Sequence, residues 1–251
     1  ADFVLAVAGD FPVCCAAGQD HGLAHRLDLP TSGVLLVAKT YRALWRLRLD
    51  FCAQRVTKYY LALCEGRLVG RSVQTIHAPL KLLRSPAGGR SVRSHSSICP
   101  VQGLPTCTQV VCLAHLHDDL GRCFSLVLAM PVTGRTHQIR SHLSHLGHPL
   151  VADTQYGAAV ADWCPRVFLH ASAVDFADPA DVPGDSTLRA VAPLPRDLCV
   201  ALGRITAMNE HSERAVAKAI SCNADIGGFL VAVDSVGQVV NVRRLARCAL
   251  R

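Results

Sequence analysis

Short apolar segments, each followed by a turn signal, are the sequence feature that most restricts the fold. Four of them predict strands: Gly33–Ala38, Tyr59–Glu65, Val110–Leu116 and Phe124–Met130. The first is continuously apolar, which is typical of a strand buried on both faces. The last two are joined by a polar stretch and predict a hairpin, and a further hairpin is expected over residues 227–242. The chain is therefore built mainly from short strands.

A few segments have helical periodicity instead. Residues 40–55 carry apolar side chains at Leu44, Leu47 and Phe51 with arginines between them, which predicts an amphipathic helix. Residues 136–146 predict a second helix, with Thr136 as its expected cap, and residues 210–221 a third. A segment rich in Pro, Asp and Ala between residues 175 and 197 is expected to be a loop.

Composition limits the class of protein. With 251 residues, 50% of them hydrophobic and 18% charged, the chain is long enough for one large or two small domains and too apolar to be disordered. No apolar run reaches the ~18 residues that a membrane span needs, so no membrane partner is expected. The net charge is +7, and 22 of the 26 basic residues are arginine, which suits phosphate binding but also occurs in GC-rich genomes.

Basic residues gather in one acid-free stretch, residues 67–117. Within it, a Gly/Ser/Arg segment carries Arg84, Arg90 and Arg93, and a flexible basic loop of this kind is a candidate contact for RNA phosphates. The other interpretation is a solvated surface loop. A second basic group occupies the last nine residues.

The twelve cysteines form no C-x-x-C pair, which argues against a zinc ribbon, and several lie in apolar runs. They are typical of buried thiols in a reducing compartment. Four histidines crowd twelve residues: His137, His142, His145 and His148. A zinc site built from them would need a third ligand of suitable spacing, and none is evident, so no metal is expected.

An aspartate at the mouth of the first strand is unusual on local grounds. Asp28 follows His25-Arg26-Leu27 and precedes Leu29-Pro30-Thr31-Ser32-Gly33, so it lies between apolar side chains where a carboxylate needs a partner. The simpler interpretation is a turn aspartate beside local Thr and Ser hydrogen bonds. Asp28 is the first candidate functional residue.

Two further segments concentrate polar side chains. Thr133–Arg140 ends a strand and opens a helix, and its Arg135 and Arg140 are candidates to bind phosphate or to pair with a buried carboxylate. Lys58-Tyr59-Tyr60 begins a strand whose alternation places Lys58 and Tyr60 on one face, where the Tyr60 ring is available to a base. Solvated arginines and a packed tyrosine are the simpler interpretations.

These segments together resemble the RluA-type pseudouridine synthases. The stretch from His25 to Gly33 with its apolar strand is similar to the catalytic motif of that family. Residues 134–140 are similar to its second signature, which continues through His142-Leu143, residues 146–149, Asp153 and Tyr156-Gly157. Its base-stacking strand is matched by Lys58, Tyr60, Ala62 and Gly66. The segments Ala78-Pro79-Leu80 and Leu169-His170-Ala171 also match, and the order and spacing agree over residues 20–203.

The resemblance implies an α+β domain with a mixed, largely antiparallel bent sheet, flanking helices and a central cleft. It implies that Asp28 is the catalytic nucleophile, that Arg140 pairs with it, and that Tyr60 stacks on the target uracil. Ile139 is implied to pack beside the site, and Arg26 to enter the RNA stack when the uridine is flipped out. Asp28 would attack or stabilise C1′ of the ribose or add to C6 of uracil, without metal or cofactor.

The chain also departs from the family pattern. Gly9–Pro12 stands where a lysine-containing motif is usual, and Ala152-Asp153 stands where Gly-Asp is usual. Residues 204–251 match nothing in the family, so we expect a catalytic domain over residues 1–203 and a carboxyl-terminal extension that offers a surface to protein partners.

The function implied is isomerisation of uridine to pseudouridine in structured RNA, with rRNA of a large-subunit precursor as the expected partner. The alternative is an RNA-binding ribosome-assembly factor in which catalysis is dispensable, and a weaker one is a zinc hydrolase. The expected location is an intracellular reducing compartment, either mitochondrion or cytoplasm.

Overall fold

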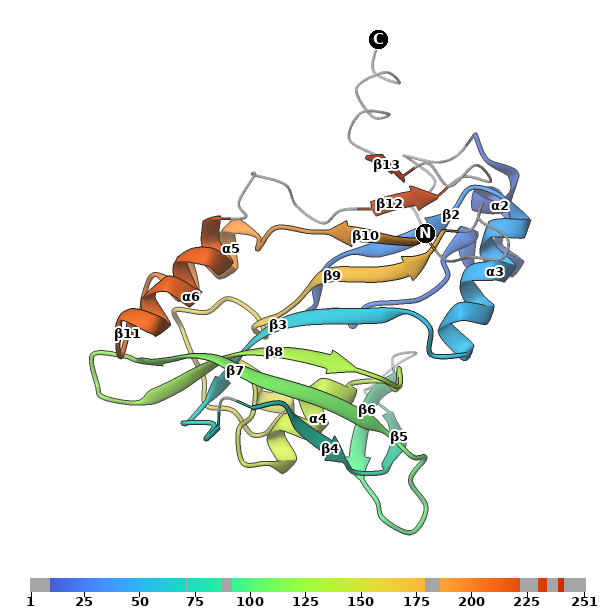
Figure 1. Cartoon of the computed structure of the whole chain (residues 1–251). Coiled ribbons are helices and arrows are strands. Elements are labelled where there is room, and N and C mark those ends of the chain that lie inside the picture. Colours follow the sequence, from blue (N-terminus) through green and yellow to red (C-terminus); the bar gives the residue numbers. More distant parts are fainter. Residues whose placement is uncertain are drawn as a thin grey trace.

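The computed structural model describes residues 10–70, 72–86, 92–178, 186–221, 230–233 and 239–241. A curved, mostly antiparallel sheet runs through its centre (Figure 1). The eight strands are β1 (Ser32–Gly33), β3 (Thr57–Glu65), β4 (Gln74–His77), β7 (Cys107–His117), β8 (Cys123–Pro131), β9 (Leu169–Ala177), β10 (Thr187–Val191) and β11 (Thr206–Ala207).

The main path of the sheet runs β1-β9-β3-β8-β7-β11, with β10 also paired to β9 and β4 to β7. Among the strands described, β1 is the one that pairs in parallel in this sheet, along β9. The α+β class and the mixed, largely antiparallel sheet expected from the sequence are therefore confirmed.

Smaller strands complete the fold. β2 (Leu35–Ala38) pairs in parallel with β12 (Leu230–Val233), which pairs with β13 (Val239–Asn241). The last two strands confirm the expected hairpin of residues 227–242, although its turn lies outside the described residues. β5 (Leu80–Pro86) and β6 (Val92–Ile98) form a separate antiparallel pair.

The described helices are α2 (Pro12–Cys15), α3 (Tyr41–Cys52), α4 (Gln138–His145), α5 (Arg196–Leu202), α6 (Glu210–Ser221) and the short 3₁₀ segments η1 (Ala17–Gly22) and η2 (Thr154–Tyr156). Helices α5 and α6 lie at one end of the main sheet, α2 and α3 at the other, and α4 beside β7 and β8 (Figure 1). Among the described residues, no helix is long and apolar enough to cross a membrane.

Local sequence explains most of these elements. Thr40 caps α3 by accepting a hydrogen bond from the Ala43 amide, and Leu44 and Leu47 bury the apolar face of that helix. β7 alternates buried and half-buried residues along its whole length, as expected of a strand with one face in the core. The hairpin of β7 and β8 was predicted correctly.

Two local expectations were wrong. The segment between residues 175 and 197 is not a simple loop, because β10 forms there and buries Ala190 against the sheet. Thr136 does not cap the second helix: α4 begins later, after His137, whose left-handed backbone (φ 52°) turns the chain into the helix. In both cases tertiary contacts outweigh the local preference.

The residues after position 203 join the main sheet. β11 pairs with β7, and the buried Ser212 hydroxyl accepts a hydrogen bond from the His115 amide (3.1 Å). One face of α6, with Val216 and Ile220, packs on the cluster that contains Leu116. We therefore infer that the folded unit continues to at least residue 221, whereas the sequence placed its boundary at residue 203.

This packing predicts unequal effects of two neighbouring substitutions on α6. Val216→Asp places a carboxylate against apolar side chains and is expected to lower the free energy of unfolding by ~1–3 kcal/mol. Ala217→Asp, on the exposed side of the same helix, is the matched control and is expected to cost less than ~1 kcal/mol. Denaturant unfolding measures both, and equal effects would contradict the packing of α6 on the sheet.

Candidate active site

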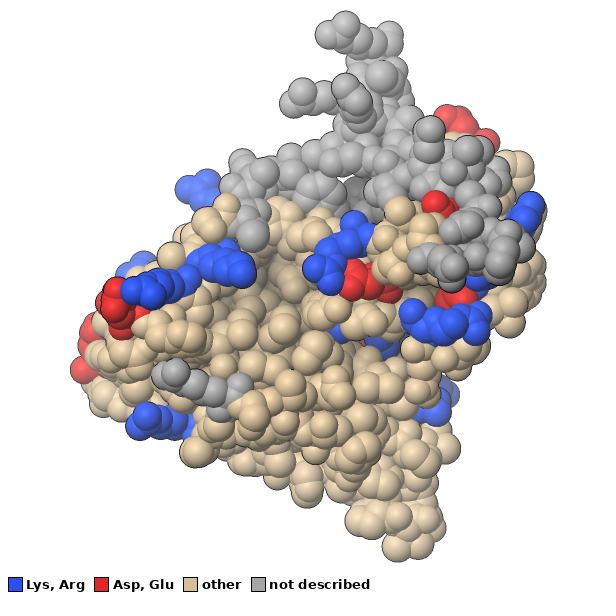
Figure 2. Space-filling view, in the orientation of Figure 1, with Lys and Arg blue, Asp and Glu red and all other residues tan. Residues whose placement is uncertain are grey.

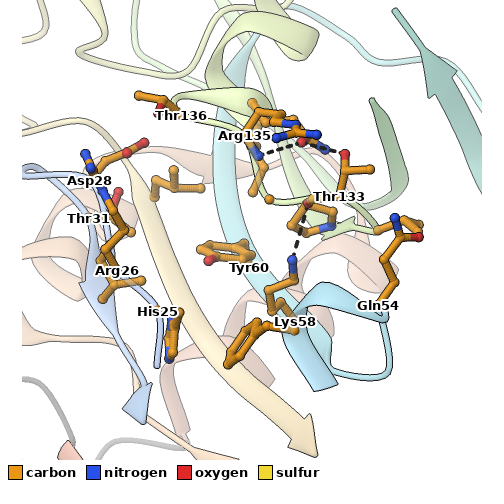
Figure 3. Close-up of a pocket in the computed structure, with 18 of the residues that line it drawn as sticks. His25, Arg26, Asp28, Thr31, Gln54, Lys58, Tyr60, Thr133, Arg135 and Thr136 are labelled. Carbon is orange, nitrogen blue, oxygen red and sulfur yellow. Dashed lines mark hydrogen bonds between the residues drawn. The ribbon is translucent and has the colours of Figure 1, made fainter. Parts of the chain in front are cut away.

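A cleft of about 540 Å³ opens between the segment before β1, the start of β3 and the turn after β8. Asp28 and Arg26 lie on one wall, Thr133 and Arg135 on the opposite wall, and Tyr60 between them (Figure 3). The described residues that line it are Ala24–Asp28, Thr31, Phe51, Cys52, Gln54, Lys58, Tyr60, Pro131–Thr136, Gln138, Ile139 and Leu169.

The wall that carries Asp28 is held from both ends. The His25 ring accepts a hydrogen bond from the Leu36 amide (2.9 Å), and burial, with a smaller effect of the Lys58 charge, lowers the pKa of His25 to about 4. The uncharged ring can therefore accept that bond. At the other end, Arg166 donates to the Pro30 carbonyl and the Ser32 hydroxyl. Asp28 between these anchors keeps 18% of its side chain exposed.

Tyr60 and Lys58 reach the cleft from β3. Their side chains lie on one face of the strand, as predicted. Burial, assisted by the nearby charge of Asp28, raises the pKa of Tyr60, so the phenol stays protonated and presents a neutral ring.

Lys58 is a buried cation whose hydrogen bond in the described residues goes to the Thr133 carbonyl (3.3 Å). Burial lowers the pKa of Lys58 to about 8. Among the described residues, no carboxylate lies within ion-pair distance of its ammonium group.

The opposite wall is organised by a buried glutamine. The Gln138 carbonyl oxygen accepts from the Thr133 hydroxyl (2.7 Å) and the Arg135 amide (3.0 Å), while its amide nitrogen donates to the Cys107 carbonyl and the Thr108 hydroxyl. Ile139 lines the cleft beside it and is 6% exposed. Arg135 is exposed at the cleft.

Arg140 does not make the ion pair expected of it. Its guanidinium binds both carboxylate oxygens of Asp153 (2.6 and 2.7 Å) and the Gln155 side chain (3.0 Å). Among the described residues, the group within ion-pair distance of Asp28 is the His137 ring, with Nε2 4.0 Å from Oδ1. The structure does not show the expected Arg140–Asp28 ion pair, and Nε and Nη2 of Arg140 bind Asp153 instead.

Asp153 and Tyr156 complete the surroundings of Arg140. The Arg140 guanidinium lies over the Tyr156 ring, 4.8 Å from its centre. Ala152, which precedes Asp153, has a left-handed backbone (φ 63°), a conformation that favours the glycine usual at this position in the resembling family. The sequence matched Asp153 and Tyr156 to the family signature but gave them no role in the site.

The crowded histidines serve different parts of the structure. His142 is buried against Thr106 and Thr108, His148 contacts the Glu65 carbonyl, and His137 contacts Tyr156. Across the described ranges no three metal-binding side chains converge. These divergent contacts leave the zinc hydrolase alternative without support.

Only one arginine of the predicted basic loop has a described side chain. Arg84 is exposed on β5 and is not among the residues that line the cleft. Arg90 lies outside the described residues, as do the side chain of Arg93 and the arginines of the last nine positions. Their contact with RNA stays a prediction.

Comparison with known proteins decides the family. The model of the RNA pseudouridylate synthase family matches residues 17–145, which carry Asp28, Tyr60 and Arg140. This chain belongs to the RNA pseudouridylate synthase family. The match covers the cleft from His25 to Ile139.

Relatives with curated names support the same assignment. Ribosomal large subunit pseudouridine synthase C of Vibrio cholerae is 37% identical over 73% of this chain and 55% of its own length. The protein of the same name from Yersinia pestis is 38% identical over 70% of this chain and 52% of its own. The chain thus spans about half the length of the curated relatives it matches.

Two solved human structures are similar in fold. RNA Pseudouridylate Synthase Domain Containing 1 has 29% identity and a TM-score of 0.60, covering 86% of this chain and 89% of its own. RNA Pseudouridylate Synthase Domain Containing 4 has 22% identity and a TM-score of 0.55, covering 74% and 77%, and supports the fold alone.

The geometry around Arg140 predicts which carboxylate depends on it. Arg140→Ala leaves the 1%-exposed Asp153 unpaired and is expected to cost ~3–5 kcal/mol of stability. Adding Asp153→Asn should recover part of this loss, with a coupling energy of ~1–3 kcal/mol in a double-mutant cycle. Thermal and denaturant unfolding give the energies.

The matched cycle combines Arg140→Ala with Asp28→Asn. Its coupling energy is expected to be smaller, because Arg140 makes no direct ion pair with Asp28 in the described structure. A larger coupling for Asp28 than for Asp153 would restore the pairing expected from the sequence.

Proposed function

We propose that this chain isomerises uridine to pseudouridine in RNA, with Asp28 as the nucleophile. The proposal rests on the position of Asp28 in the cleft, in a chain that belongs to the RNA pseudouridylate synthase family. Of the described residues that line the cleft, it is the one carboxylate, and it lies across from the aromatic ring of Tyr60. A cleft of about 540 Å³ also lies within the usual range of small-molecule sites, ~300–1,000 Å³.

The reaction rearranges one nucleotide and consumes no second reactant. The N1–C1′ bond breaks, C5 of the turned uracil bonds to C1′, C5 loses a proton and N1 gains one. The Asp28 carboxylate serves either route, by attack on C1′ or by addition to C6, because both use an anionic oxygen. In this proposal the Tyr60 ring supports the uracil and Ile139 packs beside it.

Access to the cleft requires the uridine to leave its helical stack, which costs a few kcal/mol. Arg26 is exposed on the Asp28 wall, where its side chain is available to fill the space that the flipped base leaves. Lys58 and Arg135 contribute positive charge to the same cleft. These three residues are therefore proposed RNA contacts.

The positive side chains that line the cleft favour RNA binding there. On the face drawn in Figure 2, Lys and Arg side chains form separate groups with acidic side chains beside several of them. No single extended basic surface appears among the described atoms of that face. We assign the main phosphate contacts to Arg26, Lys58 and Arg135 because they line the cleft, and keep Arg84, Arg90 and Arg93 as further proposed contacts.

The proposed substrate is structured rRNA of the large ribosomal subunit, because the names of the curated relatives specify that subunit. We further propose that surfaces after residue 203 take part in protein contacts. The location in mitochondrion or cytoplasm stays a prediction.

Replacement of the nucleophile tests the chemistry. Asp28→Asn keeps the volume and removes the charge, so it is expected to abolish pseudouridine formation, at least a ~10³-fold loss, while RNA affinity changes less than about threefold. Mass-spectrometric mapping of pseudouridine after incubation with rRNA measures product formation, and filter binding measures RNA affinity. Asp119→Asn, exposed in the turn after β7, is the matched control and should keep full activity.

Turnover by the Asn variant at a tenth of the wild-type rate would rule out Asp28 as the nucleophile. Full support of ribosome assembly in cells by the inactive variant would favour the assembly-factor alternative instead.

Removal of charge at the cleft tests the RNA surface. For single-stranded RNA each phosphate contact adds ~0.7 to the slope of log affinity against log salt concentration. Arg26→Gln with Arg135→Gln is therefore expected to weaken binding at physiological salt and flatten the slope by ~1.4.

Arg204→Gln, exposed after α5 at the far end of the sheet, is the control and should leave the slope unchanged. An unchanged slope in the double variant would move the phosphate contacts elsewhere, first to Arg84, Arg90 and Arg93.

A further inference from the structure

His137 lies behind the cleft in an unusual backbone conformation. It precedes α4 with φ 52° and ψ 24°, in the left-handed region that few residues other than glycine adopt, although Asn, Asp and His do so more often than the rest. The side chain of His137 is 13% exposed. His137 is not among the residues that line the cleft. Strain of this kind persists where surrounding contacts hold it and is common at functional sites.

The Tyr156 hydroxyl lies beside one nitrogen of the His137 ring. The Tyr156 hydroxyl oxygen accepts a hydrogen bond from the Ser96 amide (2.9 Å) and lies 3.1 Å from His137 Nδ1. With an amide already donating to this oxygen, its own proton is free to point at Nδ1. When the Tyr156 hydroxyl donates to Nδ1, the neutral imidazole carries its proton on Nε2.

The protonated nitrogen faces Asp28. Nε2 of His137 is 4.0 Å from Oδ1 of Asp28, close enough to become a hydrogen bond after a small shift of either side chain. Nε and Nη2 of Arg140 bind Asp153 and Gln155, so this edge of the guanidinium is not available to Asp28.

The charged and titratable groups around the ring agree with a neutral imidazole. They are Asp28, His95, Arg140, Asp153 and Tyr156. Burial, followed by the charge of Arg140, lowers the pKa of His137, and the two carboxylates oppose this shift without reversing it.

We propose that His137 is a positioning residue for Asp28: its imidazole, locked by Tyr156, directs an Nε2 proton at the carboxylate and orients it toward the uridine. This role rests on the proposed function of the cleft. It assigns to His137 the contact that the sequence assigned to Arg140.

Two substitutions of similar polarity separate positioning from simple packing. His137→Asn tolerates the left-handed backbone, but its short amide ends near the position of Nδ1 and cannot reach Asp28. His137→Gln is longer and places an amide donor near the position of Nε2. A hydrogen bond to a charged group corresponds to a ~10- to 100-fold effect on rate. We therefore expect a ~10- to 100-fold lower single-turnover rate for the Asn variant, and a rate within about fivefold of wild type for the Gln variant.

RNA affinity should change less than about twofold in both variants, because His137 does not line the cleft. Equal rates for the Asn and Gln variants, or a loss confined to RNA affinity, would overturn the proposal.

The tautomer can be read without any activity. In ¹⁵N NMR spectra of the full chain labelled at histidine, the His137 ring is expected to show a protonated Nε2 and an unprotonated Nδ1. Tyr156→Phe should mix the two tautomers, and Asp28→Asn should shift the Nε2–H resonance. A proton on Nδ1 in the wild type, or a resonance insensitive to Asp28→Asn, would overturn the proposal.

This second measurement separates two kinds of failure. A wild-type chain that forms no pseudouridine in large-subunit rRNA would contradict the proposed function. The NMR spectra would still decide whether His137 directs its proton at Asp28.

Discussion

The buried ion pair of Arg140 and Asp153 is the interaction on which the arrangement around the cleft depends. It joins α4 to the 3₁₀ segment η2, and both side chains are almost fully buried. A buried ion pair is stable only when its hydrogen bonds are satisfied. Here the Arg140 guanidinium donates to both carboxylate oxygens of Asp153 and to the Gln155 side chain. The same guanidinium lies over Tyr156, so the position of that ring follows from the pair.

Tyr156 connects the ion pair to the residues behind the cleft. His95 stacks on one part of its ring (4.5 Å between centres), the Ser96 amide donates to its hydroxyl, and His137 lies at its edge. These contacts come from β6, η2 and the residue before α4. An element far from Asp28 in sequence thus contributes to the position of the groups behind it.

The cleft combines an anion, a neutral ring and a weakly held cation. The Tyr60 phenol stays protonated and Lys58 is buried without a carboxylate partner among the described residues, so neither neutralises Asp28 by a direct ion pair. Such a site leaves the carboxylate available to a substrate atom. Its walls are held by hydrogen bonds of His25, Arg166 and Gln138.

The sequence by itself determined the strand-rich fold and the residues that meet in the cleft. Apolar runs and period-two alternation are local, and they predicted β3, β7 and β8. Asp28, Tyr60, Ile139, Lys58 and Arg135 were all found in motifs and all line one cleft.

Only the tertiary structure decided how these residues are paired. The partner of Arg140, the left-handed turn at His137 and the attachment of α6 depend on side chains that approach from distant segments, and no local pattern encodes those distances. Asp153, 13 positions beyond Arg140, binds its guanidinium because the end of α4 and the following turn bring both carboxylate oxygens to Nε and Nη2.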